Sequence, residues 1–259
     1  MNQEEYFALP VAEAKHWWHQ SLKDRLKYYF AAAIQESNED QLEVLDIGCG
    51  TGGNLDFLKS HFNANINWQA CEPNAWACQY AQSRGIQTEL SSIEGYETNK
   101  RFDIVLLIDV IYHRNITPVD TLKKIRGLMK PNGVLIINSA AMPSLKRQHD
   151  KRVMGVRRYM LREMIEMCNY SGFECKDSFY WNSILTPLLW LRIQCVNSIS
   201  LIREVPNTKR SESFRSDLEI PPLLINNLMG LLLRFEFHLS KHKIRIPWGA
   251  SIMYIGRRK

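Results

Sequence analysis

A glycine-rich turn near residue 50 has the composition expected of a ligand-binding loop. The segment from Val44 to Gly53 reads Val-Leu-Asp-Ile-Gly-Cys-Gly-Thr-Gly-Gly. Glycine tolerates positive φ and lets a ligand lie against bare backbone at the carboxyl end of a strand. The spacing of Gly48, Gly50 and Gly53, with Glu72 about 20 residues after the turn, also satisfies the requirements of a nicotinamide-dinucleotide site. The glycines alone therefore do not identify the ligand.

Asp46 argues against a dinucleotide. Its carboxylate lies two residues before Gly48 and would face a pyrophosphate, which is a costly contact between like charges. S-adenosylmethionine has no phosphate, and its sulfonium and ammonium groups are cations that favour an acidic lining. The pattern Asp46-x-Gly48-x-Gly50-x-Gly52 resembles the first motif of class I S-adenosylmethionine-dependent methyltransferases. We therefore expect S-adenosylmethionine as the cofactor.

Later segments extend the resemblance to about residues 10–181 and 249–256. In the family, an acid at the end of the second strand binds both ribose hydroxyls, because a carboxylate accepts two hydrogen bonds at once. Glu72 matches that acid, Ser92 replaces the usual adenine-contacting aspartate, and residues 102–113 resemble the motif of the fourth strand. The resemblance thus implies a cofactor site formed by Asp46, Gly48, Cys49, Gly50, Glu72, Pro73, Ser92, Ile93 and Asp109.

The residues after the fourth strand indicate the class of methyl acceptor. Methyltransferases that act on amide or nucleobase nitrogens often carry Asp/Asn-Pro-Pro-Tyr there, whereas residues 108–112 read Ile-Asp-Val-Ile-Tyr. No Pro-Cys pair follows the strand, which argues against base carbon methylation through a cysteine adduct. The local sequence is similar to small-molecule and lipid-precursor methyltransferases, including ubiquinone-pathway O-methyltransferases. The resemblance implies a small-molecule or lipid-linked acceptor and favours O-methylation.

Several side chains near the predicted carboxyl edge of the sheet are candidates for catalysis. Displacement at a sulfonium needs an aligned donor and acceptor, exclusion of water and, for some acceptors, a base. His113 follows the fourth strand, and His149 with Asp150 follows the fifth; histidine titrates near neutral pH. Each has a structural alternative, a hydrogen bond at a helix start for His113 and a loop cap for the pair. The predicted acceptor side also includes Trp17 as an aromatic lid, Tyr112, Arg158 and Tyr159.

Strand and helix patterns alternate through the first 140 residues. Such alternation is typical of βαβ units and of a parallel sheet with both faces covered. Apolar runs predict strands near residues 44–47, 66–71, 86–90, 102–108, 134–138, 173–181 and 250–255. The fold class is therefore α/β, and the resemblance implies a Rossmann-like seven-stranded sheet with its last strand antiparallel.

Helical segments frame this sheet. Apolar residues at helical spacing predict a helix over residues 13–33 and another over 158–169. We divide the chain into a methyltransferase domain, residues 1–181 and 246–259 with an N-terminal helical cap at 1–34, and a helical insertion or lid between the last two strands at 182–245.

The insertion contains two apolar segments, 184–202 and 223–239, around a polar loop at 203–219. As a helix, residues 222–241 would gather polar and basic side chains on one narrow face, with Glu236 as the exception. This pattern fits three uses: peripheral contact with a membrane, a lid over an apolar substrate, or packing against the sheet or a second subunit in a homodimer. The polar face consists of Asn227, Gly230, Arg234, His238 and Lys241.

Composition excludes several classes of protein. With 45% hydrophobic and 23% charged residues the chain is globular. Its uncharged runs, among them 179–191 and 220–233, are shorter than the roughly 20 residues of a membrane-spanning helix. Six cysteines without a Cys-x-x-Cys pair argue against structural zinc or disulfides, and we expect no metal. The acidic start of the chain does not resemble a signal peptide, so we expect a cytoplasmic location, peripheral to the membrane if the insertion touches it.

Positive charge is concentrated near the end of the chain. The whole sequence has a net charge of +6, and residues 192–259 contain twelve basic and five acidic side chains. A uniformly basic nucleic-acid-binding surface would not show this distribution, so we do not expect a nucleic-acid partner. An RNA methyltransferase, an NAD(P)-dependent oxidoreductase and a non-catalytic protein that binds S-adenosylmethionine remain the alternatives.

Overall fold

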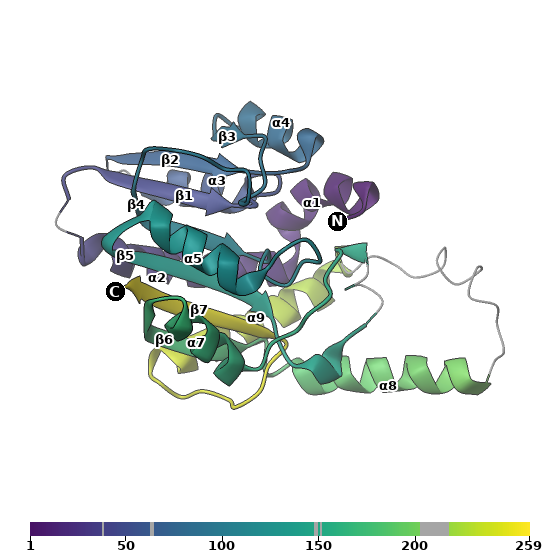
Figure 1. Cartoon of the computed structure of the whole chain (residues 1–259). Helices are drawn as coiled ribbons and strands as arrows, with labels where there is room; N and C mark the ends of the chain where they lie inside the picture. Colours follow the sequence, from purple (N-terminus) through teal and green to yellow (C-terminus); the bar gives the residue numbers. More distant parts are fainter. Residues whose placement is uncertain (38, 63–64, 148–149, 151, 203–217) are drawn as a thin grey trace.

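The computed structural model describes the chain apart from residues 38, 63–64, 148–149, 151 and 203–217. Its centre is a seven-stranded sheet with strand order β3-β2-β1-β4-β5-β7-β6 (Figure 1). The strands are β1 (Leu42–Ile47), β2 (Ile66–Cys71), β3 (Gln87–Glu89), β4 (Phe102–Ile108), β5 (Met129–Ala140), β6 (Phe173–Trp181) and β7 (Ser251–Arg258). The first five run parallel, and β7 lies antiparallel between β5 and β6. The predicted α/β fold with an antiparallel last strand is confirmed.

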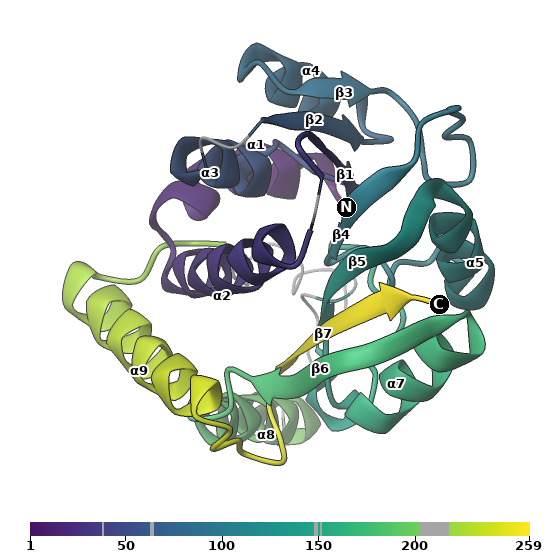
Figure 2. The same ribbon diagram turned by 90° about the vertical axis from the view of Figure 1, so that its left-hand side faces the viewer.

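Helices cover both faces of this sheet (Figure 2). The helices are α1 (Gln3–Lys15), α2 (Trp17–Gln35), α3 (Gly53–His61), α4 (Ala75–Ser83), α5 (Pro118–Leu128), the short 3-10 helix η1 (Pro143–Leu145), α7 (Leu161–Tyr170), α8 (Thr186–Ile202) and α9 (Leu223–Lys241). The apolar side chains of α2 and α3 pack on one face, and those of α5 and α7 pack on the other. Every residue of β4 is consequently buried, which explains why its sequence is almost continuously apolar.

The N-terminal region contains two helices where the sequence predicted one helix over residues 13–33. The chain leaves the helical conformation at His16, which has φ −73° and ψ 132°. The His16 Nδ1 accepts a hydrogen bond from the Trp18 N–H at 3.2 Å and so caps the start of α2. The imidazole acts here as a helix cap, a role that its residue type did not predict.

The helix predicted over residues 158–169 begins later, at Leu161. Arg158 instead turns toward Asp150, with which it forms an ion pair of 2.6 Å. Tyr159 pairs with Ala141 in an isolated parallel bridge. Both residues therefore make tertiary contacts before the helix begins.

The insertion (residues 182–245) consists of α8, which projects from the body of the molecule, and α9, which runs beside α2 (Figures 1 and 2). The polar loop predicted at 203–219 lies mostly outside the described residues. Gly230, predicted on the polar face of α9, is buried against Trp17 because α2 packs along that side. The exposed side of α9 is largely apolar and includes Leu224, Leu228, Leu231 and Phe235.

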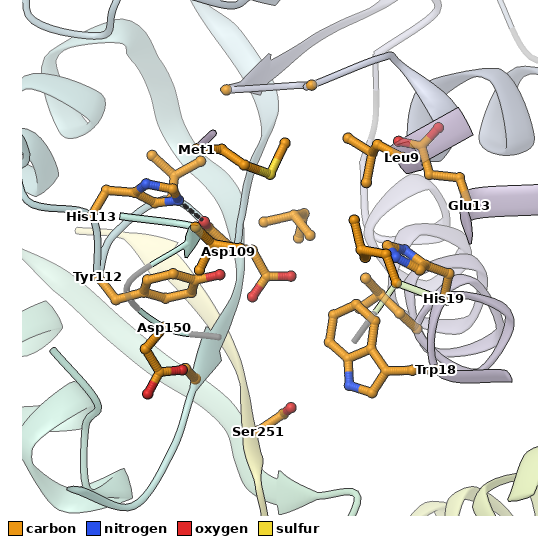
Figure 3. Close-up of a pocket in the computed structure, with 18 of the residues that line it drawn as sticks. Met1, Leu9, Glu13, Trp18, His19, Asp109, Tyr112, His113, Asp150 and Ser251 are labelled. Carbon is orange, nitrogen blue, oxygen red and sulfur yellow. Dashed lines mark hydrogen bonds between the residues drawn. The ribbon is translucent and has the colours of Figure 1, made fainter. Parts of the chain in front are cut away.

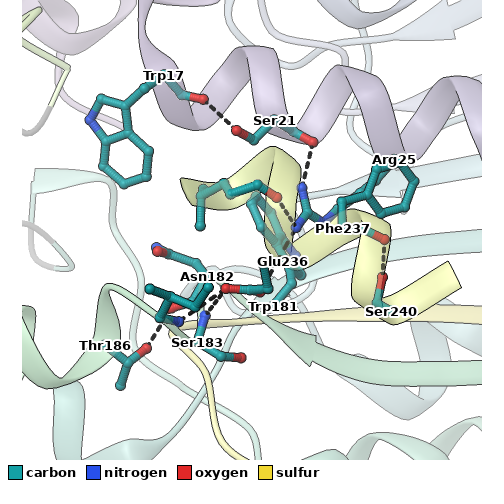
Figure 4. Close-up of polar contacts among 12 residues, drawn as sticks. Trp17, Ser21, Arg25, Trp181, Asn182, Ser183, Thr186, Glu236, Phe237 and Ser240 are labelled. Carbon is teal, nitrogen blue, oxygen red and sulfur yellow. Dashed lines mark hydrogen bonds and ion pairs between the residues drawn. The ribbon is translucent and has the colours of Figure 1, made fainter. Parts of the chain in front are cut away.

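Glu236, the acidic exception in this helix, is buried. Its carboxylate lies 3.8 Å from the Arg25 guanidinium and accepts the N–H groups of Ser183 at 2.8 Å and Ile184 at 3.0 Å (Figure 4). Glu236 therefore connects α9 both to α2 and to the start of the insertion. None of the described helices combines the length and the apolar character needed to cross a membrane.

Candidate active site

A large cavity opens at the carboxyl ends of the parallel strands (Figure 3). Its volume is about 1220 Å³. Typical ligand pockets have roughly 300–1,000 Å³, so this cavity has room for a cofactor beside an acceptor. The predicted residues that line it are Trp17, Gly48, Cys49, Gly50, Glu72, Pro73, Ser92, Ile93, Asp109, Tyr112, His113, Asp150 and Arg158.

The glycine turn forms one wall of the cavity with its backbone. Gly48 and Gly50 have φ angles of 68° and 57°, which glycine adopts without a steric penalty. The Gly50 N–H donates to Glu72 Oε2 at 2.9 Å, and the Asn74 N–H donates to Glu72 Oε1 at 2.9 Å. Two main-chain donors thus fix the Glu72 carboxylate at the end of β2, directly beside the turn.

Helix α1, within the N-terminal helical cap predicted at residues 1–34, closes the same wall through contacts that the sequence did not predict. The Tyr6 hydroxyl donates to Glu72 at 3.2 Å, and Leu9 packs over Gly50. Glu13 accepts the Thr51 hydroxyl at 2.7 Å. The sequence of α1 shows no helical periodicity, because it contains Pro10 and its apolar residues are not confined to one face.

Asp46 lies behind the turn and does not line the cavity, contrary to the prediction. Side chains alternate along a strand, so Asp46 points with Val44 to the face covered by α2 and α3. Neither carboxylate oxygen has a hydrogen-bond partner among the described residues. Burial, and then the charges of Glu72 and Glu13, raise the pKa of Asp46 to about 8.

Three carboxyl groups, of Asp46, Glu72 and Glu13, are buried around the turn, and they determine which charge a bound ligand should carry. Burial also raises the pKa values of Glu72 and Glu13, because each loses hydration. A cationic ligand would relieve the mutual repulsion of these carboxylates, whereas a pyrophosphate would add to it. The sulfonium and ammonium groups of S-adenosylmethionine therefore fit this site.

Asp109, predicted in the cofactor site, lines the cavity and is the principal polar group on the wall opposite the glycine turn. It directly follows β4 and has a φ of 60°, and its side chain points into the cavity. Both carboxylate oxygens accept hydrogen bonds from Asn138 Nδ2 at 3.1 Å, and the Tyr112 hydroxyl faces them (Figure 3). Burial raises the pKa of Asp109 to about 7, against the opposing effects of Asn138, Tyr112 and Arg158.

His113 lies beside Asp109 with its ring stacked on Tyr112 at 5.0 Å. Its Nε2 lies 2.8 Å from the backbone carbonyl of Asp109. Because a carbonyl only accepts, Nε2 carries the proton and Nδ1 keeps a free electron pair. Burial lowers the pKa of His113 to about 4, so the imidazole is neutral at physiological pH.

Of the site residues predicted between 149 and 159, Asp150 and Arg158 line the cavity and Tyr159 does not. Asp150 accepts two hydrogen bonds from Arg158, at 2.8 and 2.6 Å. Burial raises the pKa of Asp150, but the bonds and charge of Arg158 outweigh that effect and leave it lowered. Tyr159 was predicted on the acceptor side, yet it lies outside the cavity, because its hydroxyl donates to the Ile111 carbonyl at 3.2 Å. His149 lies outside the described residues.

Helix α2 contributes more to the cavity than Trp17. Trp18 is half-buried and reaches the cavity while its ring stacks on Trp181 at 5.3 Å. His19 also lines the cavity, and burial, with the nearby His16 and Lys23, lowers its pKa to about 3. The insertion adds an apolar wall formed by Leu185, Leu188, Leu189, Ile220 and Met229.

The chain belongs to the family of methyltransferase domains. The family model described as "Methyltransferase domain" matches residues 14–175, which is more than half of the chain and includes the glycine turn, Glu72 and Asp109. The predicted S-adenosylmethionine-dependent methyltransferase class, and with it the cofactor, is confirmed.

Curated relatives are similar over less than half of the chain. The ubiquinone biosynthesis O-methyltransferase of Rickettsia canadensis is 32% identical over 120 residues, 44% of this chain and 50% of the relative. That of Rickettsia felis is 30% identical over 138 residues, 48% of this chain and 56% of the relative. The (S)-coclaurine N-methyltransferase of Papaver somniferum is 27% identical over 118 residues, 43% and 33% of the two chains. The chain thus spans about half the length of the first of these relatives.

Solved structures share the fold at low sequence identity. The plantazolicin methyltransferase BamL, solved with S-adenosylhomocysteine, has a TM-score of 0.58 and 15% identity over 98% of this chain and 91% of its own. Geranyl diphosphate methyltransferase has a TM-score of 0.53 and 10% identity over 86% of this chain and 73% of its own. Identities this low establish the architecture alone.

Proposed function

We propose that the protein transfers a methyl group from S-adenosylmethionine to a small-molecule or lipid-linked acceptor, preferentially to an oxygen. The observation that carries this proposal is the group of buried carboxylates around the glycine turn: Glu72 and Glu13 line the cavity, and Asp46 lies behind it without a hydrogen-bond partner. The O-methyltransferase names of several curated relatives support oxygen as the acceptor atom. The apolar wall from the insertion suits an acceptor with a hydrophobic part.

The roles of the residues follow from their positions. The bound cofactor supplies an electrophilic methyl group. Glu72, fixed by two backbone N–H groups, would hold the ribose, with Ser92 and Ile93 beside the adenine. Helix α1 and Trp17 would exclude water from the reacting centre, which strengthens every electrostatic contact there.

The acceptor side contains the candidates for proton transfer. His113 presents an unprotonated Nδ1 and would take the acceptor proton there. Asp150 is ionised and bound by Arg158, so we assign it to holding the cavity wall. Tyr112 would keep the His113 ring in place by stacking. His149 stays a predicted base.

An acceptor panel tests this function. We would incubate the protein with radiolabelled S-adenosylmethionine and dodecyl gallate, gallic acid or dodecylamine. Methylation of the alkylated phenol in preference to the free acid and the amine is expected. Methylation of the amine alone would contradict O-methylation, and bound S-adenosylhomocysteine with no turnover on any acceptor would favour the non-catalytic alternative.

A His113→Asn variant tests the proposed base. Its turnover on dodecyl gallate should fall by about 10²–10⁴-fold, the usual contribution of a general base. His61→Asn is the matched control, because His61 is exposed at the end of α3. An unchanged turnover in His113→Asn would leave the histidine with only a structural hydrogen bond.

We also propose that residues 222–241 touch a membrane surface. Leu224 is 84% exposed, and Leu228, Leu231 and Phe235 continue the same apolar stripe, while Lys241 at the end of α9 is exposed. An apolar stripe with flanking cations is typical of interfacial helices. The cytoplasmic location stays a prediction.

Vesicle co-sedimentation tests this contact. Binding to vesicles of phosphatidylcholine and phosphatidylglycerol is expected for the wild type and should be lost in Leu224→Glu/Leu228→Glu. Tyr170→Glu on α7, also at an exposed residue, should bind as the wild type does. If the double variant instead converts a dimer into a monomer and the wild type never binds vesicles, the stripe is a homodimer interface.

A further inference from the structure

A chain of buried contacts connects Asp109 in the cavity to the helices of the insertion. The Asn138 amide donates to both oxygens of Asp109 at 3.1 Å. The Oδ1 of the same amide accepts the Trp181 Nε1–H at 2.8 Å. Asn138 and Trp181 are completely buried. Trp181 is the last residue of β6 and immediately precedes the insertion.

The bond from Trp181 determines how the Asn138 side chain is oriented. An indole N–H only donates, so it requires the amide oxygen, and the amide NH2 is then left to face the Asp109 carboxylate. The opposite orientation would place two donors against each other at Trp181 and two acceptors against each other at Asp109. Both contacts would be buried and unsatisfied, which costs about 1–3 kcal/mol for each group.

Trp181 is itself fixed by groups that belong to the helices. Trp18 stacks on its ring at 5.3 Å with an interplanar angle of 26°, and the Arg25 guanidinium lies 4.4 Å from the ring centre. Arg25 lies 3.8 Å from Glu236, which in turn accepts the first N–H groups of the insertion (Figure 4). The indole thus lies between the reaction site and the anchor of the insertion.

We propose that Trp181 is a positioning residue of the methyl-transfer site: it orients the Asn138 amide, and through that amide it sets the orientation and charge of Asp109. The contact with Arg25 and Glu236 makes this arrangement depend on the docking of the insertion. The inference rests on the proposed function only in taking this cavity as the methyl-transfer site, since the contacts themselves do not require a substrate.

The groups around Asp109 differ in whether they change charge near neutral pH. The surrounding groups are Tyr112 and His113 after β4, the Asp150–Arg158 pair after β5, His19 on α2 across the cavity, and the amino terminus at Met1. Burial lowers the pKa of His113 to about 4 and of His19 to about 3, whereas it raises that of Tyr112. Burial also lowers the pKa of the Met1 amine and raises that of Asp109 to about 7, so Asp109 is the side chain of this group that titrates near neutrality.

Nuclear magnetic resonance of the ¹⁵N-labelled full chain tests the connection without an acceptor. The indole N–H resonance of Trp181, assigned by its loss in Trp181→Phe, should shift with pH with a midpoint near 7. The shift should disappear in Asp109→Asn. The indole resonance of Trp18, assigned in Trp18→Phe, should not show this midpoint, because no bond joins Trp18 to Asn138. A pH-independent Trp181 resonance, or one that still titrates in Asp109→Asn, would overturn the inference.

Turnover on dodecyl gallate provides a second measurement. Loss of the indole donor in Trp181→Phe leaves the Asn138 amide free to rotate away from Asp109. Because the bonds from this amide lower the pKa of Asp109, the midpoint of the pH profile of turnover should rise in this variant. In Trp18→Phe, which loses only the stacked ring, the midpoint should stay in place. Equal midpoints in the wild type and Trp181→Phe would contradict the positioning role. Absence of S-adenosylhomocysteine binding by the wild type would refute the proposed function, and the resonance titration would still decide this inference.

Discussion

The two walls of the cavity are held in different ways. On the cofactor side, backbone N–H groups of the glycine turn and of Asn74 fix Glu72, and these residues lie within about thirty positions of one another. On the opposite wall, which we propose for the acceptor, Asp109 depends on Asn138 and Trp181, and Trp181 depends on the pair Arg25 and Glu236, which are far apart in the sequence. The Glu72 carboxylate is therefore fixed mainly by nearby main chain, with one long-range bond from Tyr6, whereas the acceptor wall is entirely a product of tertiary packing.

The two walls therefore depend on different parts of the chain. The glycine turn is held by β1, β2 and the start of α3, and α1 packs over it. The acceptor wall also depends on the insertion, which packs on α2 and contributes Leu185, Leu188 and Met229 to the cavity. Function on such folds lies in the attached site.

The largest expected effect tests the dependence of the acceptor wall on one buried pair. Arg25→Met leaves Glu236 charged and without its cation, and removal of one partner of a buried pair costs about 3–5 kcal/mol of unfolding free energy. Urea denaturation measures it. Arg162→Met, which removes an exposed partner of Glu166, should change stability by less than about 1 kcal/mol. Similar losses of unfolding free energy in the two variants would show that the Arg25–Glu236 pair stabilises the fold no more than an exposed ion pair does.

The next effect tests the cofactor wall. Glu72→Gln should weaken binding of S-adenosylhomocysteine about a hundredfold, or about 2.7 kcal/mol, because hydrogen bonds to a charged acceptor are lost. Isothermal titration calorimetry measures the affinity. Glu89→Gln is the control, since that exposed side chain at the end of β3 lies outside the cavity lining. Unchanged affinity in Glu72→Gln would show that the ribose is bound elsewhere.

The buried carboxylates predict a pH dependence of stability. The pKa of Asp46 is raised to about 8 in the folded chain, against about 3.9 when unfolded. Between these values the folded state binds more protons than the unfolded state, so the free energy of unfolding falls as pH rises from about 4 to about 8. Asp46→Asn should flatten this slope and raise the melting temperature at pH 8.5, by about 2–4 °C per kcal/mol. A melting temperature that increases over this pH range would contradict the assignment.

The smallest expected effects are the changes in stability on replacing each of two glycines, Gly53 and Gly127, by alanine. A Cβ at Gly53 would overlap the Glu13 carboxylate, so Gly53→Ala should displace α1 and cost about 1 kcal/mol through the lost bond to Thr51. Gly127 lies in α5 with open space at its Cβ position, and Gly127→Ala should stabilise the helix by up to about 1 kcal/mol. Thermal unfolding measures both changes in stability. If both variants were stabilised, α1 would not pack on the turn as described.

The sequence predicted the parts of the site that local patterns determine. The glycines, Glu72 and Asp109 each stand at the end of an apolar run, and the parallel topology brings these ends together. Asp46 shows the limit of this reasoning, because the alternation of side chains turns it behind the cavity wall. The direction of one strand residue depends on register, which the motif alone did not provide.

The remaining features depend on contacts between distant residues. Glu236 looked misplaced in an amphipathic helix, and only the fold brings it to Arg25. Tyr159 resembled an acceptor-side residue, but its hydroxyl reaches the Ile111 carbonyl instead. The role of α1 was hidden because its contacts with the turn, such as Leu9 over Gly50, follow no helical period.

The most direct test of the central claim is calorimetric titration of the wild-type protein with S-adenosylhomocysteine and, separately, with NADH. The acidic surroundings of the glycine turn predict micromolar binding of S-adenosylhomocysteine and no binding of NADH. Binding of NADH alone would contradict the methyltransferase assignment, because it would show that the turn accepts a pyrophosphate despite Asp46, Glu72 and Glu13.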